Sequence, residues 1–238
     1  MTQERPPSSL PSGYDLRRRL PLMGAVLAGG IATILALVYW LGVAVPARQA
    51  ADGYNDADRI YAQVMAEHNA QAVELASLAP HRSENAQVLR LAHDVGTTSA
   101  EQTDALAVWL RDRTIPVPGS ATVALALVES GGLRGAGDDR DDDGSGPRPP
   151  AGLNHVHGTA TDHGMLTPEE VTQLARLRGA EFDTALVDAL IAHHNGGLRP
   201  ADDEVTGGMD TEATAHADAE RQRIRAEVEE LLALSAGL

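Results

Sequence analysis

The polar and apolar positions after residue 55 repeat with the period of an α-helix. Between residues 56 and 78 apolar positions recur every three or four residues, which predicts one helix there. We expect Pro80 to end this helix and Ser83 to cap a second one. The apolar stripe of the first helix contains Ile60, Val64, His68, Ala72 and Leu75. That of the second contains Val88, Leu91, Val95, Leu106, Trp109 and Leu110.

A second pair of helices is predicted further along the chain. Thr167, followed by Pro168 and two glutamates, is typical of a helix start, with Thr as the N-cap and Pro at the first helical position. We expect this helix to continue to the pair His193–His194 and to end at the glycines and proline of residues 196–200. A further helix is expected over residues 211–234. Two helical hairpins of this kind pack as a four-helix bundle, so the fold class is all-α. The apolar residues 119–135 are assigned to no element.

One apolar run has no polar face. Leu22–Val45 contains no charged residue, and its 24 residues are long enough to cross a hydrocarbon layer of about 30 Å. Three arginines, Arg17–Arg19, precede it, which predicts a cytoplasmic N-terminus and an extracytoplasmic main domain. The alternative is a cleaved signal peptide, but its apolar core is normally only about 7–15 residues long. We therefore predict a single-pass anchor in the plasma membrane.

These patterns divide the chain into five parts. The segment Gly137–Gly152 is charged and rich in glycine and proline, which is typical of an exposed, mobile linker. The predicted parts are a cytoplasmic tail (1–20), a transmembrane helix (21–45), a first hairpin with its trailing apolar segment (46–136), an acidic, histidine-containing linker (137–165) and a second hairpin (166–238).

Composition narrows the range of partners. Aromatic residues make up 3% of the chain, so Ala, Leu and Val must build the core, which favours helices over strands. The formal net charge is −15, which excludes nucleic acid as a partner. An excess of carboxylates either serves solubility alone or attracts a basic protein. The chain has no cysteine and therefore no disulfide and no thiolate metal ligand.

The histidines are the main candidates for metal binding. At the predicted end of a helix, His193 and His194 either complement the helix dipole or bind a metal ion. Met65 and His68 lie three residues apart on one helical face and form a second candidate ligand pair. A weaker set of candidates lies in the predicted linker region and consists of His155, His157, His163 and Met165.

Catalytic motifs are missing from the sequence. No histidine follows a glutamate by three residues, as a ferritin-type di-iron site requires. The motifs H-E-x-x-H and G-x-S-x-G and a phosphate-binding glycine loop are also absent. We therefore expect no enzymatic activity and no resident cofactor, with copper as the one metal to consider.

Two segments carry a resemblance to a known family. Residues 65–76, "MAEHNAQAVELA", resemble the M-x-x-H-H-x-x-A-x-x-M-A motif of the bacterial family called domain of unknown function 305. Residues 163–197, from "HGMLTPEE" to "IAHHNGG", resemble the second half of that family. The resemblance implies a ferritin-like, extracytoplasmic fold and, in some members, copper binding through His and Met. This chain has other residues at four of the family's His or Met positions: Asn69, Leu75, Leu190 and Pro200.

Two functions follow as hypotheses. The first is a non-catalytic accessory subunit that docks an acidic helical domain on a larger membrane complex, for which we name the respiratory chain, through cytochrome c or oxidase subunits. The missing ligands and the acidic charge favour it. The alternative is an extracytoplasmic copper-binding or copper-buffering protein.

Overall fold

The computed structural model describes residue 30 and residues 33–44, 53–133 and 163–238. The chain divides into two compact units, Met1–Asp52 and Gly53–Leu238. Every regular element in the described residues is helical, which confirms the all-α prediction. The predicted linker Gly137–Gly152 lies outside the described residues, as do residues 22–29, 31–32 and 45 of the predicted transmembrane segment.

The first unit contributes a short helical segment. Residues 33–39 are helical and continue into the π-helix η1 (Trp40–Ala44). None of the helices in the described part of the chain is both long and apolar enough to span a membrane.

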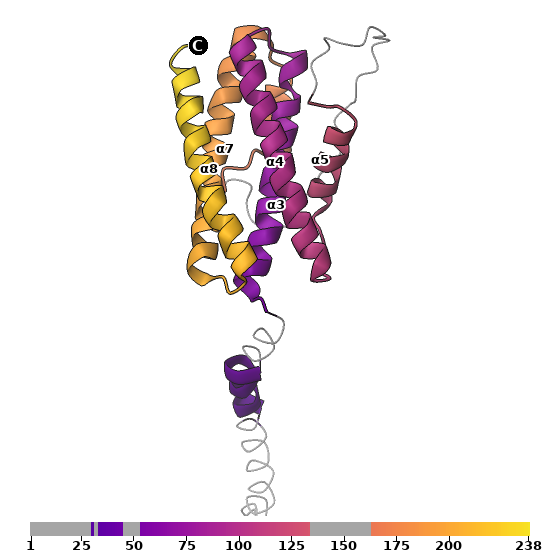
Figure 1. Ribbon diagram of the computed structural model, residues 1–238, viewed down its shortest axis with the longest axis vertical. Coiled ribbons are helices and arrows are strands. Elements are labelled where there is room, and N and C mark those ends of the chain that lie inside the picture. The colour runs from indigo at the N-terminus through magenta and orange to yellow at the C-terminus, as the bar shows by residue number, and fades with distance from the viewer. Residues whose placement is uncertain (1–29, 31–32, 45–52, 134–162) are drawn as a thin grey trace, which may run out of the picture. The chain divides into compact units, whose positions relative to one another are not determined.

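Four long helices of the second unit lie side by side (Figure 1): α3 (Asp56–Ser77), α4 (Ala86–Asp112), α7 (Gly179–Gly207) and α8 (Thr211–Ser235). The pairs α3–α4 and α7–α8 are the two predicted hairpins, and α3 packs against α7 to join them. The unassigned apolar segment forms α5 (Gly119–Glu129), which packs on α3 and α4. Its apolar residues therefore cover the outside of the first hairpin.

Side-chain caps fix where most of these helices begin. Asn55 accepts hydrogen bonds from the first turn of α3, and the Asp58 carboxylate accepts one from the Asn55 N–H, which completes a capping box. Asn85 caps α4, so the prediction that Ser83 would do so was wrong; Ser83 instead accepts a hydrogen bond from the Asn85 N–H. Asp210 caps α8 through the N–H groups of Glu212 and Ala213. Between α3 and α4, Pro80 lies in the 3₁₀ turn η2 (Ala79–His81).

The predicted third helix is broken in two. Thr167 caps α6 (Pro168–Leu174) with a capping box, as expected, but α7 begins afresh at Gly179, whose φ is +57°. Arg82, which lies between α3 and α4, stabilises this break. Its guanidinium donates to the carbonyl of Ala175 at 2.7 Å, and its own carbonyl accepts from the Gly179 N–H at 2.8 Å. The helix therefore breaks where tertiary hydrogen bonds replace the helical ones.

The predicted helix end at residues 196–200 was wrong, because α7 continues through Pro200 to Gly207. A proline inside a helix costs about 3 kcal/mol, so local propensity predicts an end here. Pro200, Ala201 and Glu204 are all buried, which shows that the segment packs against the rest of the bundle. Burial of a helical face outweighs local propensity in most protein helices.

The core has two apolar layers with a polar layer between them. One layer contains Leu75, Leu78, Val88, Phe182, Leu186, Leu190 and Leu231. The other contains Tyr61, Met65, Leu106, Trp109, Leu110 and Ile224. In the sequence of α3, α7 and α8, the residues between these layers include His68, His193 and Glu227. Ile60, expected on the buried stripe, is 50% exposed, since Tyr61 and Met65 point inward instead.

Candidate functional site

The histidines of the two hairpins meet in the middle of the bundle. His68 of α3 and His193 and His194 of α7 are 3%, 0% and 1% exposed. The prediction that His193 and His194 end a helix was wrong, because α7 continues for three more turns. The helix dipole therefore does not explain them, and their surroundings inside the core do. We call these three residues the histidine centre.

Two imidazoles of the centre stack face to face. The rings of His68 and His193 lie 3.8 Å apart with an angle of 17° between their planes. The Nε2–H of His68 donates to the backbone carbonyl of His193 at 3.0 Å. This approach requires a glycine at position 197, because a Cβ there would lie 2.9 Å from Cε1 of His68. The glycine that was expected to stop the helix thus makes room for the imidazole.

Burial keeps these two rings neutral. Burial, followed by the interaction with His194, lowers the pKa of His68 to about 4. Burial, followed by the nearby His68 and His194, lowers the pKa of His193 well below its ordinary value. Neither ring nitrogen of His193 has a hydrogen-bond partner among the described residues, and neither has Nδ1 of His68. Buried polar atoms without partners are uncommon in folded proteins.

His194 has a different environment. Its Nδ1 donates to the carbonyl of Leu190 at 2.8 Å, and its Nε2 lies 2.8 Å from the carboxylate of Glu227. Both ring nitrogens of His194 therefore face oxygen atoms, and the ring is paired with Glu227.

The sequence did not predict the ion pairs beside the centre. On α8 the guanidinium of Arg223 donates to Glu220 at 2.9 and 2.5 Å and also to Glu227. Burial would raise the pKa of Glu220, but its hydrogen bonds with Arg223 outweigh burial and lower it. One signal was available: Glu220 lies in the apolar register of α8, whose other members are Ala213, Ala217, Ile224 and Leu231.

Residues 163–166 pack against the bundle beside the centre. The Gln71 side chain donates to the Leu166 carbonyl at 2.8 Å and accepts from the Leu166 N–H at 2.7 Å. A Cβ on Gly196 would overlap the carbonyl of His163, so α7 passes close beneath this segment. His163 and Met165 are half-buried, which corrects the prediction that they belong to a solvated linker. His155 and His157 lie outside the described residues.

The arrangement does not fit a copper ion as it stands. Parallel stacked rings present their nitrogens side by side, whereas a shared metal needs lone pairs that converge on one point. Both nitrogens of His194 are already engaged. Met65 is buried in the apolar layer next to the centre. In the part of the chain that the structure describes, no three His, Asp or Glu side chains are grouped to hold a metal ion.

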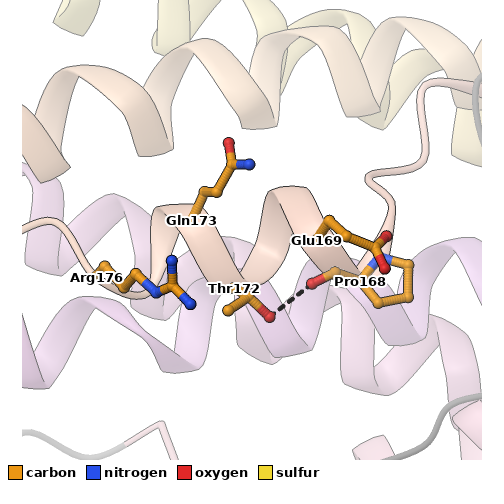
Figure 2. A pocket seen from close by; sticks show the side chains of 5 residues that line it. All are labelled: Pro168, Glu169, Thr172, Gln173 and Arg176. Carbon is orange, nitrogen blue, oxygen red and sulfur yellow. Dashed lines mark hydrogen bonds between the residues drawn. The ribbon is translucent and has the colours of Figure 1, made fainter.

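A pocket in the described part of the chain lies elsewhere. Figure 2 shows this hollow along α6, lined by Pro168, Glu169, Thr172, Gln173 and Arg176. Thr172 donates its hydroxyl to the carbonyl of Pro168 at 2.7 Å. All five lining residues are exposed, and the three buried histidines are not among them. The hollow is therefore a surface feature of a seven-residue helix and not an entrance to the centre.

Comparisons with known proteins agree with the fold. The chain is similar to a crystal structure of a putative secreted DUF305 protein from Streptomyces coelicolor, with 22% identity and a TM-score of 0.55, over 76% of this chain and 93% of that one. It is also similar to a DUF305 fragment from Deinococcus radiodurans, with 19% identity and a TM-score of 0.58, over 78% of this chain and 99% of that one. The comparison with curated proteins gives no match. The family model called domain of unknown function (DUF305) matches residues 58–235, and the chain belongs to this family.

Proposed function

We propose that the protein is a non-catalytic accessory subunit that docks an acidic helical domain on a larger membrane complex. The observation that carries this proposal is a row of carboxylates along one exposed face of α4, formed by Asp94, Glu101, Asp104 and Asp112. Successive members of the row are seven, three and eight residues apart, which puts them on one side of the helix. Arg111 pairs with Asp104 at 3.5 Å. We call this row the acidic stripe.

The histidine centre supports a role without chemistry. A substrate has no access to imidazoles that are 0–3% exposed. His194 and Glu227 are paired with each other, and Arg223 supplies the positive charge that balances Glu220. Groups that neutralise one another in this way balance the buried charge of the bundle.

The predicted anchor supports a membrane location for the partner. In the described part of this segment the apolar side chains are exposed, with Ile34, Leu35, Val38 and Tyr39 each at least 60% exposed. The similar protein from Streptomyces coelicolor is described as secreted, which favours an extracytoplasmic place for the bundle. The proposed partner is a respiratory complex, because a cytochrome c domain or an oxidase face offers a basic surface on the extracytoplasmic side of the membrane.

Native purification of the full-length protein tests the proposal. Extraction in mild detergent followed by native separation should recover it with a larger complex at low salt and less of it at high salt, because salt screens the acidic stripe. The variant D94N/E101Q/D112N should lose the complex. A matched control, E169Q/E229Q/E230Q, removes three exposed carboxylates elsewhere and should keep it. Free migration of the wild type at both salt concentrations, or equal loss in both variants, would contradict the proposal.

Copper binding is a second candidate, favoured by the ring nitrogens of His193. Because neither has a partner among the described residues, the ring can turn toward a metal without losing a hydrogen bond. Copper would then be held by His193 and the Nδ1 of His68, and a soft Cu(I) ion suits such a buried site. Metal analysis of the purified full-length protein decides between the two candidates. One equivalent of copper that resists mild chelation and disappears in H68N/H193N would favour this function, whereas a trace amount would count against it.

A further inference from the structure

A second buried polar cluster lies at one end of the bundle, where α3 begins and α7 turns into α8. It consists of three carboxyl groups, Asp58, Glu204 and Asp210, which are 0%, 1% and 8% exposed. Three buried carboxylates at one place repel each other unless donors or protons balance their charge. The hydrogen-bond partners of each group therefore show how this cluster is balanced.

Asp58 connects two distant parts of the chain. Its carboxylate accepts from the N–H of Asn55 at 2.6 Å within its own helix start. It also accepts from the N–H of Met209 at 3.0 Å and of Asp210 at 2.9 Å, in the turn between α7 and α8. Three backbone donors stabilise an ionised carboxylate. Asp58 thus holds the α7–α8 turn against the start of α3.

Asp210 is also balanced by donors. Arg113, which follows α4, donates to it at 2.6 Å, and the indole of Trp109 donates at 3.3 Å. Burial would raise the pKa of Asp210, but the hydrogen bonds from the Ala213 N–H, Arg113 and Trp109 outweigh burial and lower it. Asp210 is therefore ionised at neutral pH, and Arg113 is its counter-ion.

Glu204 is the exception. Neither of its oxygens has a donor among the described residues, although both are buried. The chain makes room for this carboxyl group at Gly208, where a Cβ would overlap Oε1 of Glu204. The charged groups facing it are Asp58 and Asp210, and the hydroxyl of Tyr61 on α3 is the other titratable group close enough to feel its charge.

We propose that Glu204 carries a proton that it shares with Asp58, and that this proton acts as a pH-dependent clasp between α7 and α3. The protonated Glu204 is the donor that its surroundings otherwise lack, and Asp58 is the acceptor. Loss of the proton would place a second buried negative charge beside Asp58. The two carboxylates would then repel each other, and the α7–α8 turn would loosen from the start of α3.

The pKa values agree with this geometry. Burial, followed by the hydrogen bond with Asp58 and the charges of Asp58 and Asp210, raises the pKa of Glu204 to about 8. Burial, followed by the charges of Glu220 and Glu204, raises the pKa of Tyr61, so its hydroxyl stays neutral. A carboxyl group whose pKa is higher in the folded state stabilises the fold fully below about pH 4.5. This stability is lost as the pH rises through about 8.

The test compares the full-length wild type with E204Q, which keeps the shape and cannot ionise. As the pH rises from 5 to 9, the wild-type midpoint of thermal unfolding should fall below that of E204Q by about 5 °C or more. D203N is the matched control, since it removes the neighbouring exposed carboxylate, and its profile should follow that of the wild type. Parallel profiles for the wild type and E204Q would overturn the proposal.

Infrared spectroscopy observes the proton directly. At pH 7 the wild type and D203N should show the carbonyl band of a buried carboxylic acid, and E204Q should lack it. In D58N the band should persist, but it should titrate about one pH unit lower or more, because the negative neighbour is gone. A wild type without this band at pH 7, or a titration that D58N leaves unchanged, would also overturn the proposal.

Discussion

The histidine centre and the carboxyl clasp solve the same problem in opposite ways. Both bury ionisable side chains from α3 and α7 inside one bundle. In the histidine centre burial removes protons: the pKa of His68 falls to about 4. In the clasp burial retains a proton: the pKa of Glu204 rises to about 8. The difference follows from charge type, because a low-dielectric interior favours the neutral form of each group, which is a deprotonated imidazole but a protonated carboxyl.

The two regions also differ in how their remaining charges are balanced. Beside the histidine centre, Arg223 of α8 pairs with both Glu220 and Glu227 of the same helix. In the clasp the ionised groups rely on backbone N–H donors and on Arg113, from another part of the chain. The charge beside the centre is therefore balanced by one arginine. The charge of the clasp is balanced by donors whose position depends on the α7–α8 turn.

The largest effect is expected from R223M. This change leaves Glu220 without its counter-ion. The side chain of Glu220 is 0% exposed, and the side chain of Arg223 is 15% exposed. Removing one partner of a buried ion pair costs about 3–5 kcal/mol, so we expect the free energy of unfolding to fall by about 4 kcal/mol. Chemical denaturation of the full-length protein measures it. R225M, which removes an exposed arginine two residues away, should change stability by less than about 0.5 kcal/mol.

Neutralising the carboxylates as well separates charge from packing. The triple variant R223M/E220Q/E227Q should recover a large part of the lost stability, because no unpaired charge remains buried. A triple variant as unstable as R223M would mean that the arginine acts by filling space.

A medium effect is expected from pH, because the two regions respond in opposite directions. Between pH 7 and 5 the histidine centre loses stability, since His68 stays neutral when folded and becomes charged when unfolded. The clasp stabilises the fold more at pH 5 than at pH 7, because the folded state holds the Glu204 proton more tightly than the unfolded state does. The wild type should therefore change little, whereas E204Q should lose about 2 kcal/mol between pH 7 and 5. Denaturant titrations at the two pH values measure this, and an equal response of the wild type and E204Q would contradict the comparison.

A smaller effect is expected from G197A. Within a helix, glycine to alanine normally stabilises by about 0.5–1 kcal/mol. Here the new Cβ would lie 2.9 Å from Cε1 of His68 and 3.1 Å from Cδ1 of Ile224, so we expect a loss of about 1.5 kcal/mol. G207A in the same helix is the control, because its Cβ would meet only Ala57, at 3.8 Å. Thermal unfolding of both variants should shift in opposite directions, and a stabilising G197A would mean that His68 moves freely.

Local sequence signals determined several elements correctly. The predicted helices over residues 56–78 and 211–234 agree with α3 and α8 within one residue at each end. Thr167 was recognised as a cap because a Thr-Pro-Glu-Glu start satisfies the first N–H groups of a helix without help from elsewhere. The family resemblance was also carried by short motifs, and the family model confirms it.

Other features could be decided only by the tertiary structure. Gly196, Gly197 and Pro200 locally favour a helix end, but the burial of α7 keeps the helix intact and places His193 and His194 in its interior. The break before Gly179 exists because Arg82, almost a hundred residues earlier, binds the backbone there.

The sequence by itself thus determined the helical class, the hairpin order and which histidines were candidates, because helix periodicity and caps act over a few residues. It did not determine which polar groups share the interior. His68 stacks on His193, Asp58 faces Glu204, and Arg113 pairs with Asp210, each across about a hundred residues or more. Which protons and charges those groups hold depends on burial and on partners from other helices, and only the packed bundle sets both.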